Sequence, residues 1–223
     1  MSFKILYVIA TDVEARTLRL KIDSLKESWL PGNFEIHFLI TGVGSAATAW
    51  NLKDWFVLHG KPDLAINAGI AGSFRDDIVL GEVVMPVTDC FADSGIEDGD
   101  NFLTLNEAGL MGEDEFPFIN GILNADPEYT GKMKDILRPV KAITLNTATG
   151  SELSRLKLVK KFNPDIETME GATFFYICRR ENISFLALRA ISNKVETRNK
   201  NNWNISLALN NLSEKVLEIL LKL

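Results

Sequence analysis

The sequence has few of the residues on which metal sites and disulfide frameworks depend. Its 223 residues include two cysteines, Cys90 and Cys178, and two histidines, His37 and His59. Two widely separated cysteines match no zinc-ligand spacing and are typical of a reducing compartment. Two isolated histidines exclude a histidine-rich metal site and the HExxH motif of metallohydrolases. We therefore expect neither a metal ion nor a cofactor.

Long apolar runs and a basic surplus are also missing. No stretch of 18 uncharged apolar residues is present, so we expect no membrane association. The 24 Lys and Arg residues are outnumbered by 30 Asp and Glu, which argues against nucleic-acid binding. Only 15 Gly and 7 Pro, with 46% hydrophobic residues, exclude collagen-like and disordered chains. The N-terminal segment 1–10 lacks the features of a secretory signal, so we expect a cytoplasmic protein.

Strand-like and helix-like segments alternate along the chain. Continuous apolar runs predict strands at 3–9, 34–41, 64–68, 82–87, 142–146 and 183–191. Apolar residues at helical spacing predict helices at 13–26, 45–58, 168–180 and 204–221. The alternation indicates an α/β fold: a three-layer single domain, 1–223, with a mixed, largely parallel central sheet flanked by helices. In such folds, ligands bind beyond the carboxyl ends of the strands.

Residues 89–128 depart from this pattern. They include eleven acidic residues and no Lys or Arg, so the rest of the chain carries a surplus of five positive charges. A connection of this length in a compact domain is typical of a functional loop or lid, although a solvated acidic excursion explains the composition as well. The segment is no EF-hand, because Leu103 stands where a loop starting at Asp98 would need glycine.

Two glycine-rich segments follow predicted strands. Residues 42–44 (Gly-Val-Gly) partly match a dinucleotide fingerprint, but the next strand ends in Asn67 and Ala68 and supplies no acid for a ribose. Residues 69–72 (Gly-Ile-Ala-Gly) form a second small-residue segment, which we expect to be a turn. Each could be a tight turn alone. Side by side, the two suggest a flat aromatic or sugar ligand that lies against the backbone.

Three polar side chains stand at the expected ligand end of the sheet. Glu14 lies in the first turn of a helix, where an exposed glutamate favoured by the helix dipole is the simpler interpretation. Glu170 precedes a largely small and apolar helix segment, and burial of an unpaired carboxylate is costly. Asn193 ends a strongly apolar strand, although Ser192-Asn193 could be an ordinary turn.

Taken together, these segments resemble the nucleoside phosphorylase and nucleosidase superfamily, which cleaves N-glycosidic bonds of purine nucleosides on this type of fold. The resemblance covers nearly the whole chain. Each motif is short, but five follow the expected elements in the expected order. They are residues 10–14, 41–44, 67–72, 168–171 and 189–193.

The resemblance implies a role for each matching residue. Glu14 would activate water, and Asn193 would stabilise the departing purine. Glu170 would bind a ribose hydroxyl, with Met169 packed on the sugar. The other implied substrate contacts are Gly44, Gly69, Ile70, Ala71, Thr149 and Thr168. We add Arg198 as a candidate partner for a substrate carboxylate, with a solvated loop arginine as the alternative.

Two departures from the superfamily pattern narrow the expected reaction. Adenine-specific members have aspartate where this chain has Asn193. An amide NH2 can donate to O6 and N7, so Asn193 predicts a 6-oxopurine leaving group. Bacterial phosphorylases place a phosphate-binding arginine where this chain has Asn67. Loss of that arginine with retention of Glu14 favours water over phosphate as the nucleophile.

Within the superfamily, the chain resembles the futalosine hydrolases. This resemblance is carried by residues 10–11 before 13–14, 91–100, 147–150, 169–172 and 192–198, with Trp203. It implies hydrolysis of futalosine to hypoxanthine and dehypoxanthine futalosine in menaquinone biosynthesis, by a homodimer or higher homo-oligomer. Three alternatives stay open: a 6-oxopurine nucleoside phosphorylase, a methylthioadenosine/S-adenosylhomocysteine nucleosidase-like hydrolase, and a non-catalytic nucleoside-binding module.

Overall fold

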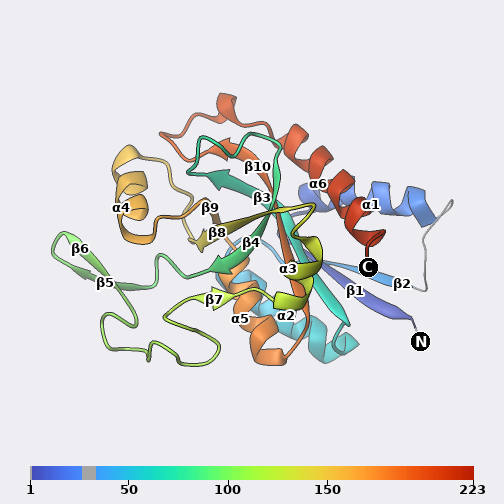
Figure 1. Ribbon diagram of the computed structural model, residues 1–223, viewed down its shortest axis with the longest axis horizontal. Helices are drawn as coiled ribbons and strands as arrows, with labels where there is room; N and C mark the ends of the chain where they lie inside the picture. The colour runs from blue at the N-terminus through green and yellow to red at the C-terminus, as the bar shows by residue number, and fades with distance from the viewer. Residues whose placement is uncertain (1, 27–33) are drawn as a thin grey trace.

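A computed structural model describes residues 2–26 and 34–223 of the chain. Within these residues, an eight-stranded mixed sheet forms the centre of the molecule (Figure 1). Its strands are β1 (Phe3–Ile9), β2 (Phe34–Ile40), β3 (Leu64–Ser73), β4 (Val83–Asp89), β7 (Leu123–Asn124), β8 (Arg138–Thr144), β9 (Ile166–Thr168) and β10 (Phe185–Lys194). A separate hairpin consists of β5 (Gly95–Asp98) and β6 (Asn101–Thr104).

The sheet closes on itself at one end. Its strands follow the order β10-β4-β8-β9-β3-β1-β2, and β10 also pairs with β3. The five strands β3, β9, β8, β4 and β10 therefore form a ring, filled by an apolar cluster that includes Ala71 and Ile191. Most pairings are parallel, whereas β4 with β10, β3 with β9 and β4 with β7 are antiparallel.

Helices cover both faces of the sheet. On one face α1 (Asp12–Lys26) packs beside α6 (Ile205–Leu220), with α3 (Pro127–Met133) nearby (Figure 1). On the other, α2 (Ser45–His59) packs against α5 (Gly171–Glu181). The helix α4 (Glu152–Phe162) lies beside the β5–β6 hairpin, and a short 3-10 helix spans Lys200–Asn202. Side-chain caps help to start several helices: Ser151 accepts from the Ser154 amide, and Asn204 accepts from the Leu207 amide.

The predicted fold class is confirmed, but several expected boundaries are wrong. Strand β3 continues to Ser73, so residues 69–72 belong to a strand and not to a turn. The expected helix at 168–180 begins at Gly171, because residues 166–168 pair with β3 and β8 as β9. Asn193 lies within β10, beside a bulge in its pairing with β3. None of the helices in the described part of the chain is long and apolar enough to cross a membrane.

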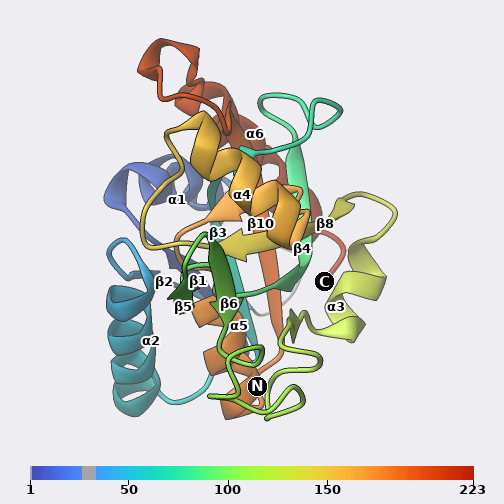
Figure 2. The ribbon, with the colours of Figure 1, turned by 90° about the vertical axis from the view of Figure 1, so that its left-hand side faces the viewer.

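The acidic segment 89–128 has structure of its own. It contains the β5–β6 hairpin and strand β7, which pairs with the end of β4. Figure 2 places the hairpin and the following loop on one side of the molecule, near α4. The hairpin region is linked to α4 by an ion pair between Glu107 and Lys161. The solvated excursion that the composition suggests is thus a folded layer beside the sheet.

Candidate active site

Glu14 is held against strand β3. The residue is only 9% exposed. The Ile70 amide donates to Glu14 Oε1 at 3.1 Å, and the Thr11 hydroxyl donates to Oε2 at 2.7 Å. A Cβ on Gly69 would lie 3.0 Å from Oε1, so this glycine lets the carboxylate approach the strand closely. The exposed first-turn glutamate, the simpler interpretation from sequence, is therefore wrong.

Glu170 joins the beginnings of two helices. It directly precedes α5, and its Oε1 accepts from the Gly44 amide, just before α2, at 2.9 Å. Gly44 has a φ of 90°, which favours glycine. Burial raises the pKa of Glu170, whereas the Gly44 amide and the positive charge of Arg189 oppose this rise. The negative charge of Glu14 raises the pKa further, so the two carboxylates belong to one electrostatic site.

A chain of hydroxyl groups supports the start of α5. The Gly171 amide donates to the Thr168 hydroxyl at 3.2 Å, and the Ala172 amide donates to Thr144 Oγ1 at 2.7 Å. The two threonine hydroxyls are 3.1 Å apart, and Thr144 donates to Asp89 Oδ1 at 3.0 Å. The Thr168 hydroxyl thus contributes to the position of Glu170. Its predicted contact with substrate stays a prediction.

Arg189, the first residue of the motif 189–193, is a buried cation beneath the site to which the sequence assigned no separate role. Its Nη1 donates to the backbone oxygens of Asn67 and Leu188, each at 2.9 Å, and its Nη2 donates to Asn67 Oδ1. Burial lowers the pKa of Arg189, and three carboxylates oppose this shift: Glu170, Asp89 and Glu14. The sequence does contain a signal for this role, namely an arginine within an otherwise apolar strand. A charge buried in such a strand requires compensating polar groups.

Asn193 lies where β10 bulges against β3. Its Nδ2 donates to the Lys194 carbonyl at 2.9 Å, and its Oδ1 accepts from the Ser192 hydroxyl at 2.7 Å. Only an NH2 group can donate to the Lys194 carbonyl, so the orientation of the amide is fixed. One N–H of Asn193 remains for a ligand. The turn that Ser192-Asn193 suggested is instead part of this strand.

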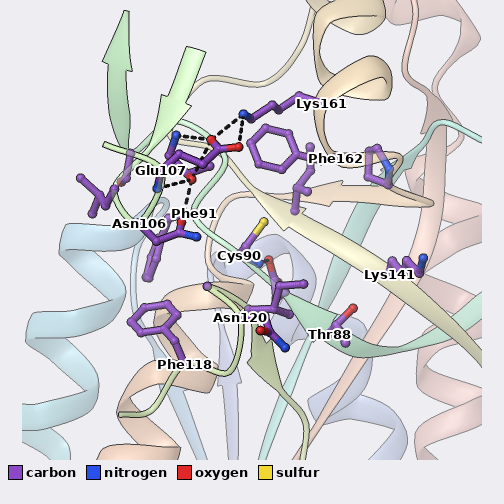
Figure 3. Close-up of a pocket in the computed structure, with 18 of the residues that line it drawn as sticks. Thr88, Cys90, Phe91, Asn106, Glu107, Phe118, Asn120, Lys141, Lys161 and Phe162 are labelled. Carbon is purple, nitrogen blue, oxygen red and sulfur yellow. Dashed lines mark hydrogen bonds and ion pairs between the residues drawn. The ribbon is translucent and has the colours of Figure 1, made fainter. Parts of the chain in front are cut away.

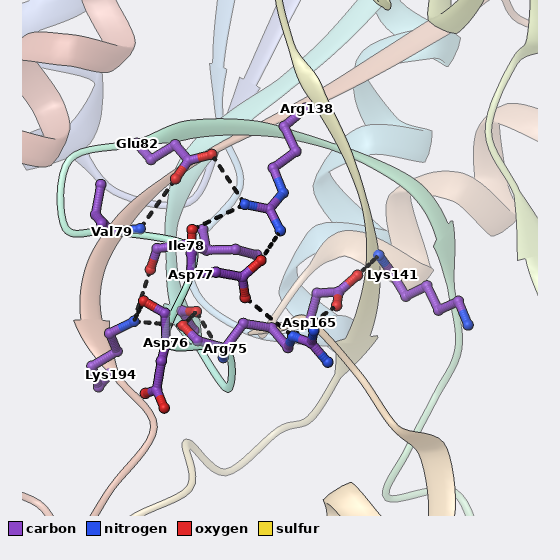
Figure 4. A network of polar contacts seen from close by, with 11 residues as sticks. Arg75, Asp76, Asp77, Ile78, Val79, Glu82, Arg138, Lys141, Asp165 and Lys194 are labelled. Atoms are coloured by element: carbon purple, nitrogen blue, oxygen red, sulfur yellow. Dashed lines mark hydrogen bonds and ion pairs between the residues drawn. The ribbon is translucent and has the colours of Figure 1, made fainter.

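Lys194 ties the end of β10 to the β3–β4 loop (Figure 4). Its Nζ donates to the carbonyls of Arg75 at 2.5 Å and Ile78 at 2.8 Å. On the same loop, Asp77 accepts from Arg138 Nη2 at 2.5 Å, which connects the loop to β8. These contacts restrain the backbone next to Asn193 and so stabilise the position of its amide.

Two further predicted residues, Thr149 and Arg198, lie on loops that meet at Gly150. The Thr149 amide donates to Glu167 Oε1 at 3.0 Å. The Arg198 amide donates to the Gly150 carbonyl at 3.2 Å, which brings two predicted site loops together, and Arg198 itself is exposed. Ala71, by contrast, packs its side chain in the apolar interior of the ring. Glu167 was not predicted as a site residue from sequence. It lies in β9, one position before the motif 168–171.

Cavities flank the acidic layer. One of about 1120 Å³ lies between the β5–β6 hairpin, α4 and residues 147–150; it meets the site at Thr149, whereas Glu14 and Glu170 do not line it. A smaller cavity of about 270 Å³ contains Cys90 and Phe91 beside the Glu107–Lys161 ion pair (Figure 3). Burial raises the pKa of the Cys90 thiol to about 12, which keeps it protonated near neutral pH. In the described part of the chain, no group of three His, Cys, Asp or Glu could hold a metal ion.

Comparisons with known proteins identify the family. The model of the phosphorylase superfamily matches residues 32–223. The chain belongs to the phosphorylase superfamily. A futalosine hydrolase from Streptomyces coelicolor is 31% identical over 193 residues, which cover 84% of this chain and 78% of that protein. A 5'-methylthioadenosine/S-adenosylhomocysteine nucleosidase from Buchnera aphidicola is 28% identical over 198 residues, which cover 85% of this chain and 82% of that protein.

Solved structures support the same superfamily fold. The futalosine hydrolase of Helicobacter pylori matches with a TM-score of 0.80 at 15% identity, and the alignment covers 99% of this chain and 98% of that one. The match of the family model confirms the family resemblance predicted from five short motifs. At this level of identity the structural match defines the fold alone.

Proposed function

We propose that this member of the phosphorylase superfamily is a nucleosidase that hydrolyses the N-glycosidic bond of futalosine, a 6-oxopurine nucleoside, in menaquinone biosynthesis. The products are hypoxanthine and dehypoxanthine futalosine. The observation that carries the proposal is the buried Glu14 carboxylate, fixed by Ile70 and Thr11 in the same electrostatic site as Glu170. The 31% identity to a futalosine hydrolase supports the choice of substrate.

Glu14 is the general base in this mechanism. Each of its oxygens accepts one hydrogen bond in the protein, which leaves lone pairs for a water molecule. The water oxygen attacks C1′ and its proton passes to Glu14, while the electron pair of the C1′–N9 bond leaves with the purine. Such base catalysis contributes about 10²–10⁴-fold. Glu170 binds a ribose hydroxyl, and Met169 packs on the sugar.

Asn193 stabilises the departing purine. Its free N–H donates to the O6–N7 edge of hypoxanthine, where negative charge develops as the bond breaks. The sequence predicted that both N–H groups of the Asn193 amide would donate to the purine. One of them already donates to the Lys194 carbonyl. An amide cannot supply a proton as a carboxylic acid does, so N7 takes its proton from another source.

Phosphorolysis is the main competing reaction. At the position where the phosphorylases resembling this chain bind phosphate, Asn67 directs its side chain to Arg189 and to the Val8 carbonyl. Asn67 carries no positive charge with which to bind phosphate, and its amide is engaged inside the sheet, which supports hydrolysis. The decisive assay incubates the protein with futalosine, inosine and methylthioadenosine, with and without phosphate. Hypoxanthine and free sugar without phosphate support the proposal. Sugar 1-phosphate, or adenine as the preferred product, would contradict it.

Arg198 binds the aryl carboxylate of futalosine in this proposal. It is exposed on the loop that meets Gly150. Replacement by methionine (Arg198→Met) should raise KM for futalosine and leave KM for inosine, which has no carboxylate, unchanged. Equal changes in KM for both substrates would exclude Arg198 as the partner of the carboxylate.

The assembly we propose is a homodimer through α2. This helix presents Trp50, 74% exposed, and Val57, 78% exposed, on its outer surface. The two residues are seven positions apart and so lie on one face of the helix, where exposed large apolar side chains favour burial against a partner. Because α2 begins beside Gly44, the interface would adjoin the site. Sedimentation should show a dimer that Trp50→Ser with Val57→Lys converts to monomer; a wild-type monomer would rule it out.

A further inference from the structure

Glu167 and Asn193 flank the same glycine. Gly72 on β3 pairs with Glu167 on β9 and with Asn193 on β10. Residues directly opposite each other on paired strands project their side chains to the same face. A Cβ on Gly72 would lie 3.2 Å from Asn193 Nδ2 and 3.4 Å from Glu167 Cγ. The two polar side chains therefore stand on either side of one position that has no side chain.

Glu167 has a carboxylate oxygen without a partner. The residue is only 7% exposed, and its Oε1 accepts from the Thr149 amide at 3.0 Å. Its Oε2 is buried and accepts no hydrogen bond from any described residue. Burial raises the pKa of this carboxyl group, and the Thr149 hydroxyl and amide oppose the rise. Such a buried acceptor is costly unless a ligand donates to it.

The chemistry of the purine edge identifies that donor. N7, O6 and N1 follow one another along one edge of a 6-oxopurine, and N1 carries a hydrogen. In adenine, N1 has a lone pair instead. With Asn193 donating to the O6–N7 end, the next position along the edge is N1. A carboxylate there accepts from hypoxanthine and is repelled by adenine.

We propose that Glu167 determines base specificity by accepting the N1–H of a 6-oxopurine through Oε2. The assignment rests on the proposed function, which places the base beside Asn193. It divides recognition between two side chains: Asn193 donates to the O6–N7 end and Glu167 accepts from N1. Removal of either side chain should weaken binding of hypoxanthine by about 10–100-fold, the usual range for a hydrogen bond to a charged group.

Base binding tests this role without any reaction. Titration calorimetry of hypoxanthine, 1-methylhypoxanthine and adenine should show at least a tenfold preference of the wild type for hypoxanthine over its 1-methyl derivative. Glu167→Ala should reduce that preference to within about threefold. Glu167→Gln, whose amide can accept from hypoxanthine or donate to adenine N1, should raise adenine binding. Glu196→Ala, which removes an exposed carboxylate from the following loop, should retain the wild-type pattern.

The outcomes separate the two proposals. If Glu167→Ala keeps the full preference for hypoxanthine, or if the folded wild type binds all three bases alike, Glu167 does not contact N1. Circular dichroism shows whether Glu167→Ala is folded. If it is not, Glu167→Gln, which keeps the size of the side chain, provides the test. If the wild type distinguishes the bases as expected but releases no hypoxanthine from any nucleoside, the proposed hydrolase function fails and the Glu167 assignment stands.

Discussion

Asn67 holds the guanidinium of Arg189 through both its side chain and its backbone. Its Oδ1 accepts from Nη2, and its backbone oxygen accepts from Nη1 at 2.9 Å. Asn67 Nδ2 in turn donates to the Val8 carbonyl at 2.9 Å, so one amide connects β10 to β1 across β3. The resulting buried positive charge lies among the carboxylates on which the proposed reaction depends.

Asn67→Ala should destabilise the protein by about 2–3 kcal/mol. The substitution removes the side-chain acceptor of a buried cation and leaves the Val8 carbonyl without its donor, and hydrogen bonds to charged groups contribute about this much. Urea unfolding measures the difference, with the exposed Asn201→Ala as a matched control. A free energy of unfolding within about 0.5 kcal/mol of wild type, well below this range, would show that the backbone carbonyls alone satisfy Arg189.

Glu14→Gln should nearly abolish turnover and leave the fold intact. The amide cannot take a proton from water, so we expect kcat to fall by about 10²–10⁴-fold. Release of hypoxanthine is the measurement, and circular dichroism checks the fold. Asp12→Asn, which changes an exposed acid in the same helical turn, should keep wild-type kcat. Substantial activity in Glu14→Gln would exclude its role as the base.

Much of this site could be predicted from sequence because its chemistry follows strand ends. Apolar runs defined β1 and most of β10, and helical spacing defined α1, which places Glu14 and Asn193 at the correct edge of the sheet. The glycine segment 69–72 was misassigned because glycine is typical of turns. In the structure, it is part of a strand that lets the side chains of Glu14, Glu167 and Asn193 approach the backbone.

Glu167 could not be recognised from local sequence. Its position depends on two strand pairings: Gly72 with Glu167 on one side, and Gly72 with Asn193 on the other. The register of these pairings is set by strands far apart in the chain, including a bulge after Ile191. Asp89 is similar, because its burial results from packing against Gly171 and Thr144.

Asn193→Asp should shift selectivity toward adenine nucleosides or abolish activity. An ionised carboxylate accepts from the amino group of adenine and is repelled by O6 of hypoxanthine. The new carboxylate would also lie beside the Lys194 carbonyl, which loses the donor it now has. The ratio of kcat/KM for inosine and methylthioadenosine measures the shift. An unchanged ratio in an active variant would refute the proposed role of the amide.

Asp89 should make the stability of the protein fall as pH rises from about 4 to 7. Burial raises the pKa of Asp89 to about 7 from an ordinary value of 3.8, and its Oδ2 has no hydrogen-bond partner among the described residues. In this interval the folded protein retains a proton that the unfolded chain has lost. The free energy of unfolding therefore decreases with pH, by an amount on the order of 2–4 kcal/mol.

Asp89→Asn isolates this contribution, because an amide has no carboxyl proton to lose. Its Oδ1 can still accept from the Thr144 hydroxyl and the Cys90 amide. Urea unfolding at pH 5 and pH 8 should show a smaller loss of stability in this variant than in wild type, whereas the exposed Asp54→Asn should behave like wild type. Equal losses in all three proteins would mean that Asp89 is ionised in the folded state at both pH values.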